Sequence, residues 1–136
     1  MALNVPLLRQ NFALVVERDS QVVHHFYGIL FERYPQLKPM FHRVPPAKQE
    51  EMLAGMLVAV MDHLEDASWF AANLEALGAR HRDYGVTEEM FGWVGECFLA
   101  TLSKVSGPDW NPDVEAAWIA VYGEITKAML RGAAQA

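Results

Sequence analysis

The chain has 136 residues, of which 52% are apolar and 21% are charged; this supports one compact domain and excludes a disordered chain. Seventeen acidic residues against eleven basic ones give a formal net charge of −6, which argues against a nucleic-acid partner because phosphates would be repelled. The single cysteine, Cys97, excludes an internal disulfide and a cysteine-rich zinc site.

The beginning of the chain and its apolar runs bear on where the protein resides. The first residues, from Met1 to Pro6, lack the basic lead and long apolar stretch of a signal peptide. The longest uncharged apolar run spans residues 52–61, far short of the roughly 20 residues that a membrane-spanning helix needs. We therefore expect a cytoplasmic protein of one domain, residues 1–136, with no membrane segment.

A helical spacing of apolar residues runs through the first half of the chain, and strand signals are nearly absent. A first helix is predicted over 5–17, and Asp19 is expected to help cap a second over 20–34. Pro35 ends this second helix, because the residue before a proline is pushed out of helical geometry. After a short turn and a proline pair, a third helix is predicted over 46–64.

The second half continues the same helical pattern. A helix is predicted over 67–81, followed by Gly85, which can take the left-handed conformation that closes a helix. The next helix spans 88–105, and Asn111 is a strong capping residue for the last helix, 112–131. The sequence therefore predicts an all-α fold of about six helices in one layered bundle.

Three polar residues lie on helix faces that otherwise consist of core residues: Tyr27, Gln49 and His81. Burying a hydroxyl, an amide or an imidazole costs a few kcal/mol unless each group finds a partner. Either these groups satisfy one another and the backbone, or they surround something polar that the chain itself does not supply.

His81 has two readings. It is either a core histidine bonded to a backbone carbonyl or a neutral imidazole that binds a metal. The other histidines are not spaced as a zinc or di-iron site requires; they are His24, His25, His42 and His63. One histidine on an apolar face suits a metal that brings its own equatorial ligands, as haem does. No phosphate-binding loop, dinucleotide fingerprint or nucleophile elbow is present.

Several segments, in consistent order over residues 20–130, carry a family resemblance. They are Phe26-Tyr-Gly-Ile-Leu-Phe-Glu-Arg-Tyr-Pro35, Pro39-Met-Phe41, Gln49 with Leu53, His81-Arg-Asp-Tyr-Gly-Val86, Phe91-Gly-Trp-Val-Gly-Glu96 and Ala117-Trp-Ile-Ala-Val-Tyr-Gly123. As a set, this chain resembles bacterial haemoglobins and the globin domain of flavohaemoglobins. The first helix matches only loosely.

The resemblance implies the globin fold, a three-on-three helical sandwich around haem b (iron protoporphyrin IX). It implies that His81 is the proximal iron ligand and that Phe41 packs on the porphyrin. Tyr27, Gln49 and Leu53 would form the distal pocket, where the hydroxyl and amide face dioxygen. The proximal side and edge would be lined by Leu77, Val86, Phe91 and Val94.

Two departures from the flavohaemoglobin pattern limit what the resemblance implies. Those globins place a tyrosine and a glutamate near the proximal histidine, whereas the corresponding positions here read Phe91 and Ala133. Strongly activating, peroxidase-like chemistry is therefore not expected. The chain also stops where a flavin and nicotinamide reductase would begin, so electrons would have to come from a separate reductase.

Three functions are consistent with these residues. The leading hypothesis is reversible binding of dioxygen for delivery, storage or buffering, with CO and NO as further diatomic ligands. The second is a nitric oxide dioxygenase that uses a separate reductase. The third is a non-catalytic sensor or interaction globin. With Gln49 in the distal position, a second histidine on the iron is not expected; the nearest alternative, His42, is predicted to be exposed.

Overall fold

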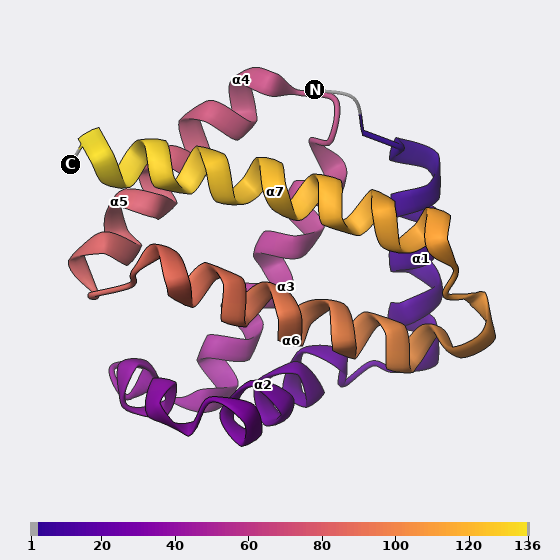
Figure 1. Ribbon diagram of the computed structural model, residues 1–136, viewed down its shortest axis with the longest axis horizontal. Helices are drawn as coiled ribbons and strands as arrows, with labels where there is room; N and C mark the ends of the chain where they lie inside the picture. Colours follow the sequence, from indigo (N-terminus) through magenta and orange to yellow (C-terminus); the bar gives the residue numbers. More distant parts are fainter. Residues whose placement is uncertain (1–2, 136) are drawn as a thin grey trace.

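The computed structural model describes residues 3–135, and within that part of the chain no residue lies in a strand. The expectation of one domain over residues 1–136 and the expectation about the first residues include Met1, Ala2 and Ala136, which lie outside the described residues. Over this described part of the chain, seven α-helices are interspersed with short 3-10 and π-helical turns (Figure 1). In chain order they are α1 (Val5–Arg18), α2 (Val22–Arg33), η1 (Pro35–Phe41), α3 (Pro46–Asp62), α4 (Ala67–Trp69), η2 (Phe70–Leu74), α5 (Glu75–Asp83), α6 (Glu88–Ser106), η3 (Gly107–Asp109) and α7 (Pro112–Gln135).

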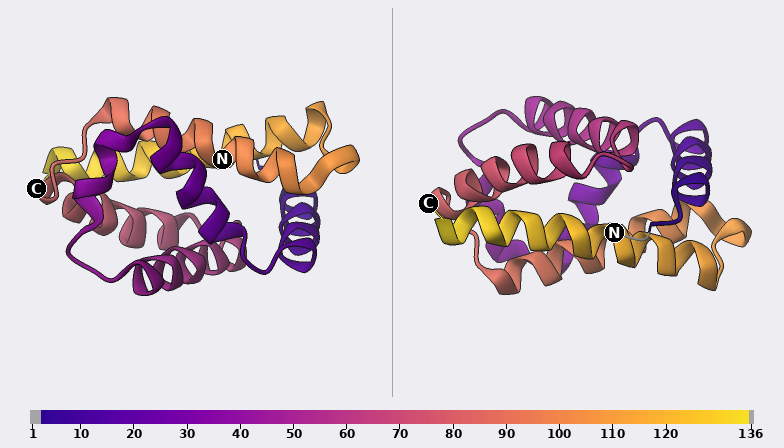
Figure 2. Two further views of the ribbon diagram at one scale, coloured as in Figure 1. Left: turned by 90° about the horizontal axis from the view of Figure 1, so that it is seen from below. Right: turned by 90° about the horizontal axis from the view of Figure 1, so that it is seen from above.

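The helices are arranged in two layers. In Figure 1, α6 and α7 run side by side and α3 crosses behind them. The turned views of Figure 2 place α3 and α5 on one side and α6 and α7 on the other, with α2 running along one edge from one layer to the other and α1 across one end. The closest packing of two helices is that of α5 on α7, and α2 packs on α6.

Most helix boundaries agree with the sequence within a few residues, and the start of α2 shows why some do not. The Asp19 carboxylate accepts a hydrogen bond from the backbone N–H of Gln21 at 2.9 Å, so it shapes the turn before the helix. Gln21, the residue before α2, makes no capping hydrogen bond with its side chain. The prediction that Asp19 caps a helix beginning at residue 20 is therefore wrong. Asn111 does cap α7, accepting from the N–H groups of Asp113 and Val114 at 3.0 Å each.

The segment predicted as one helix over 67–81 is divided into three. The Asp66 carboxylate accepts from the Trp69 N–H at 3.0 Å and starts α4. The backbone then widens into the π-helical turn η2, in which Phe70 and Leu74 are both buried. Regular α-helix resumes in α5, which ends at Asp83, and Gly85 follows with φ of +90° as predicted.

Two glycines allow α5 and α7 to approach backbone to backbone. A Cβ atom on Gly78 would overlap the carbonyl oxygen of Met129, and one on Gly132 would overlap the carbonyl oxygen of Glu75. Because the overlapping atoms belong to the backbone, no side-chain rotation could relieve the clash. The position of α5 relative to α7 therefore depends on the absence of side chains at these two glycines.

The core consists of two hydrophobic clusters. The larger, called here the Trp118 cluster, surrounds the buried Trp118; its buried members come from α1, α3, residues 64–74, α6 and α7. The smaller, called here the Tyr27 cluster, contains Phe26, Tyr27, Leu30, Leu37 and Cys97. Phe98 packs against both clusters, so the apolar interior is continuous.

A buried polar network fixes α1 against the long helices at the end of the molecule. Asn11 accepts from the Trp118 indole N–H at 2.9 Å and donates to the Ser106 hydroxyl at 3.0 Å. Asn11 is only 4% exposed, yet both ends of its amide are satisfied, so its burial carries little penalty.

Candidate functional site

Tyr27 of α2 and Gln49 of α3 meet in the interior. Tyr27 is 8% exposed, and the Gln49 amide donates a hydrogen bond to its hydroxyl oxygen at 3.1 Å. Burial raises the pKa of the Tyr27 phenol, so the hydroxyl stays protonated at neutral pH. Because Gln49 is the donor in this bond, the phenol keeps its own proton free to donate to another group.

The phenol ring of Tyr27 packs against other aromatic rings. The ring centroids of Phe31 and Phe41 lie 5.8 Å and 5.6 Å from that of Tyr27. Phe41 is the last residue of η1, and this short 3-10 segment places its ring against the rings of Tyr27 and Phe31 in α2. Leu53 and Val94 pack against the same cluster. Five of the predicted site residues are therefore gathered here: Tyr27, Phe41, Gln49, Leu53 and Val94.

His81 lies in the last turn of α5, with its ring half-buried. Its Nδ1 is 2.8 Å from the carbonyl oxygen of Leu77, and since a carbonyl can only accept, Nδ1 must carry the proton. Burial lowers the pKa of the imidazole, which favours the neutral ring. Nε2 therefore bears a lone pair, and no hydrogen bond to it is found among residues 3–135. This is the arrangement that metal-binding histidines use.

The two readings of His81 are thus compatible. The backbone hydrogen bond expected of a core histidine is present, and it uses only one of the two ring nitrogens. That bond fixes the tautomer in which the other nitrogen can bind a metal.

The remaining predicted residues lie around His81 or near it in the chain. The Val86 N–H donates to the His81 carbonyl at 3.0 Å, which folds the connection after α5 back on itself. Leu77 and Phe91 are half-buried against the Trp118 cluster. Within the described chain, no hydrogen bond or ring contact joins His81 to Tyr27 or Gln49. The predicted site therefore consists of two separately assembled groups.

Tyr122 of α7 lies next to the site, although no role for it was predicted from the sequence. Its hydroxyl donates to the Phe91 carbonyl at 2.6 Å, and its ring lies against Gly95, where a Cβ would be 2.6 Å from the ring edge. Burial raises the pKa of Tyr122 to about 12. In the sequence it belongs to the segment from Ala117 to Gly123 that carries part of the family resemblance, but nothing in that segment indicated this hydrogen bond.

The tail predicted to follow residue 131 is also helical, because α7 continues to Gln135. Ala133 therefore lies within α7 and carries no carboxylate, as the sequence indicated. Phe91 likewise offers no hydroxyl. Tyr122 is the phenol in contact with this part of α6, and its hydrogen bond goes to the main chain.

The other histidines form no metal site. His24 and His25 are exposed and lie beside Glu50 and Asp19, His63 stacks on Trp69 with ring centroids 4.4 Å apart, and His42 is exposed as expected, with Nδ1 against the Pro39 carbonyl. No group of three or more histidine, cysteine or acidic residues among residues 3–135 could hold a metal ion. A metal at His81 would have to bring further ligands of its own.

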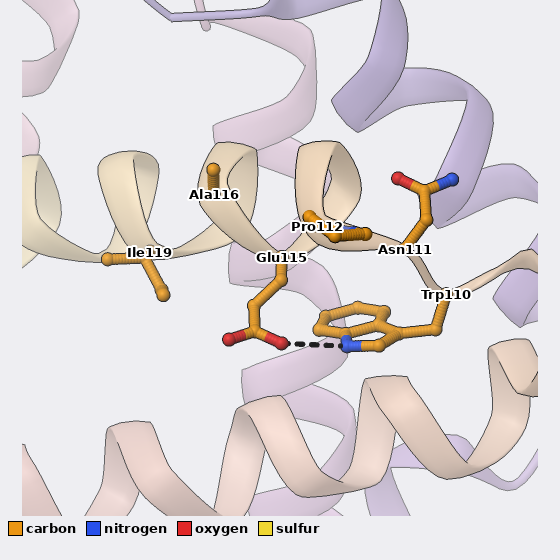
Figure 3. A pocket seen from close by; sticks show the side chains of 6 residues that line it. All are labelled: Trp110, Asn111, Pro112, Glu115, Ala116 and Ile119. Atoms are coloured by element: carbon orange, nitrogen blue, oxygen red, sulfur yellow. Dashed lines mark hydrogen bonds between the residues drawn. The ribbon is translucent and has the colours of Figure 1, made fainter.

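An open surface groove of about 370 Å³ lies elsewhere, at the corner between α6 and α7 (Figure 3). Among its lining residues, the Trp110 indole N–H donates to Glu115 at 3.2 Å, and the Asn111 side chain accepts the capping hydrogen bonds of α7. None of the predicted site residues lines this groove, and its side chains bring together no groups suited to catalysis or metal binding.

Comparison with known proteins links the chain to one family. The sequence model of the Globin family matches residues 24–129. Flavohemoproteins of Bacillus cereus and Bacillus thuringiensis are each 27% identical, over 95% and 93% of this chain. The chain spans about a third of the length of these relatives, 32% and 31%.

Solved structures share the fold. A bacterial globin from Campylobacter jejuni superposes with a TM-score of 0.80 at 22% identity, covering 96% of this chain and 94% of that one. An engineered carbene transferase from Rhodothermus marinus gives 0.83 at 24% identity, covering 96% and 91%. Ferric Aplysia limacina myoglobin gives 0.79 at 19% identity, covering 94% of each chain. These likenesses confirm the predicted fold. None of the helices within residues 3–135 is both long and apolar enough to cross a membrane.

Proposed function

This chain belongs to the globin family, whose members bind haem and through it diatomic gases, and from that premise we propose that it binds haem b and holds dioxygen reversibly and with high affinity. The observation that carries the proposal is the partly buried hydrogen bond from Gln49 to Tyr27, which leaves the phenol proton available to a ligand. The sequence resemblance points to the same two residues.

The residues present fit a haem group. His81 offers a neutral imidazole whose Nε2 is unprotonated, and this nitrogen would bind the iron. Six apolar side chains assigned to the pocket are only half-buried, an exposure that an apolar macrocycle would cover. They are Phe41, Leu53, Leu77, Val86, Phe91 and Val94.

When bound, haem supplies an iron that coordinates diatomic gases. The Tyr27 hydroxyl would donate a hydrogen bond to dioxygen in the pocket, and Gln49 would keep that hydroxyl oriented. A hydrogen bond to a charged acceptor contributes about 1.5–3 kcal/mol, which slows dioxygen release by roughly 10- to 150-fold. Carbon monoxide is less polar in the pocket and would gain much less.

The surroundings of His81 favour binding over activation of dioxygen. Phe91 carries no hydroxyl and Ala133 no carboxylate, so neither side chain adds negative charge that would be relayed to the imidazole. The carbonyl of Leu77 is the hydrogen-bond partner of Nδ1, and a neutral carbonyl makes the imidazole a weaker electron donor than a carboxylate would.

The test is an absorption spectrum followed by stopped-flow measurement. We expect a Soret band in the purified, reduced protein that shifts with dioxygen and with CO. Tyr27→Phe should speed dioxygen dissociation by roughly 10-fold or more and change CO dissociation little. Tyr34→Phe, whose hydroxyl donates to Glu96 at 2.8 Å on the surface, is the matched control. An unchanged dioxygen dissociation rate in Tyr27→Phe would contradict the distal assignment.

Nitric oxide dioxygenation is the second candidate, favoured by the flavohemoprotein relatives and by a structural neighbour described as a candidate nitric oxide dioxygenase. Each turnover would combine one NO with one dioxygen to give nitrate and would take up one electron. The electron would come from a separate reductase. Sustained NO consumption in the presence of a flavin reductase and NADH would favour this enzyme; a single turnover for each haem would favour the carrier.

We also infer that the chain forms a single domain and works in the cytoplasm. Phe98 packs against both clusters, which supports one continuous core. The only cysteine is buried, so the fold does not depend on an oxidising compartment. Cell fractionation of the tagged protein tests the location.

A further inference from the structure

Tyr84 lies against the imidazole of His81 on its outer side. It follows α5 directly, and its N–H donates to the carbonyls of Arg80 and His81 at 3.1 Å each. The ring centroids of Tyr84 and His81 are 5.9 Å apart, with the planes tilted by 57°. The Tyr84 side chain is 46% exposed, so burial in the core does not explain why its ring sits where it does.

Arg43 lies over the Tyr84 ring. Its guanidinium carbon is 5.1 Å from the ring centroid, which is a cation–π contact. Arg43 comes from the connection between η1 and α3, and its side chain makes no ion pair with an acidic residue within 3–135. No carboxylate among these residues therefore competes with the tyrosine ring for the guanidinium.

These two contacts form a chain that joins the two halves of the proposed site. Arg43 is two residues beyond Phe41, whose ring touches Tyr27. From Arg43 the contacts run to Tyr84 and then to His81. No other ring contact to His81 is found among the described residues.

The contact matters because the Leu77 hydrogen bond restrains the imidazole incompletely. One hydrogen bond fixes the position of Nδ1 and leaves the ring plane free to tilt about it. A ring packed against the imidazole limits that tilt, and a cation seated on the outer ring limits the motion of the tyrosine in turn.

We propose that Tyr84 is a positioning residue for His81, and that Arg43 holds Tyr84 in place so that the connection after Phe41 and the imidazole are mechanically coupled. The inference rests on the proposed function, in which His81 binds the haem iron. Tyr84 itself touches neither ligand nor iron in this scheme; it acts by setting the tilt of the imidazole.

The experiment compares Tyr84→Leu, Tyr84→Phe and Arg43→Gln in the haem-loaded protein. Two readouts are used: the iron–imidazole stretching band in the resonance Raman spectrum of the ferrous protein, and the rate of hemin transfer to excess apomyoglobin. Tyr84→Leu should shift the band and speed hemin loss, whereas Tyr84→Phe, which keeps the ring, should restore both. Arg43→Gln should speed hemin loss by about two- to fivefold, and Lys38→Gln, an exposed cation of η1, should change neither readout.

The double variant shows whether Arg43 acts through Tyr84. If it does, adding Arg43→Gln to Tyr84→Leu should change neither readout further. Additive effects would mean that Arg43 acts on haem directly and would overturn its part of the proposal. An unshifted Raman band in a normally folded Tyr84→Leu variant would overturn the part assigned to Tyr84. If the wild-type protein itself fails to take up hemin, the proposed function has failed instead.

Discussion

The surroundings of Tyr27 and those of His81 are built in different ways. Tyr27 is held by other side chains, through the Gln49 amide and the rings of Phe31 and Phe41. The segment that carries His81 is held mainly through the backbone: the imidazole bonds the Leu77 carbonyl, and α5 meets α7 without intervening side chains. A side-chain pocket can be altered one residue at a time, whereas a backbone arrangement changes as a unit.

The largest expected effect comes from placing one methyl group between α5 and α7. Gly78→Ala forces the helices apart, because the new Cβ overlaps the Met129 carbonyl, and should lower the free energy of unfolding by about 3 kcal/mol. Gly55→Ala in α3 is the matched control: its Cβ would meet nothing within 4 Å, so the change should stabilise by up to about 1 kcal/mol. Urea titrations of both variants measure the difference, and equal stabilities would refute the close backbone approach.

The next effect concerns Tyr122, whose hydroxyl fixes the Phe91 carbonyl. Its pKa is raised by burial to about 12 in the folded protein, from 10.0. Above pH 10 the unfolded state loses this proton first, so stability is full below pH 10 and falls as pH rises toward 12. The difference amounts to as much as about 3 kcal/mol. Unfolding free energies between pH 9 and 12 should therefore fall more steeply for the wild type than for Tyr122→Phe, and parallel curves would count against a buried phenol.

The smallest expected effect on stability is on the Tyr27 side. Gln49→Leu removes a neutral hydrogen bond that contributes about 1 kcal/mol and adds apolar surface next to Leu53, so the net loss should be below about 1 kcal/mol. Far-UV circular dichroism during urea unfolding measures this change. If Gln49→Leu lowered the free energy of unfolding as much as Gly78→Ala, the surroundings of Tyr27 would be as sensitive to change as those of His81, which would contradict the difference between them.

Much of the helical order could be predicted from local sequence signals. Pro35 ended α2, Asn111 capped α7 and Gly85 closed the turn after α5, because each acts through its own backbone geometry or a near neighbour. The π-helical turn η2 could not be predicted, since its formation depends on burying Phe70 and Leu74 against helices distant in the sequence. The prediction for Asp19 failed for a local reason: its carboxylate bonds the Gln21 N–H in the turn before α2 and so does not cap the helix.

The candidate site shows the same division. The helical spacing placed Tyr27, Gln49 and His81 on apolar faces, and the structure pairs the first two. The contacts of Tyr122 with Phe91 and of Arg43 with Tyr84 join residues 31 and 41 positions apart in the chain. No periodic pattern predicts such contacts, because they depend on how loops and helix ends meet in three dimensions.

The widened turn η2 also bears on how this chain tolerates changes in length. A π-helical turn accommodates one residue more than the α-helical path it replaces, and one residue in a regular helix corresponds to a rotation of about 100°. A deletion within residues 70–74 that restored a continuous α-helix would therefore rotate the imidazole-bearing face away from the interior, or else pull the glycine contact with α7 out of register. The extra residue thus sets the rotation of α5 about its axis relative to α4.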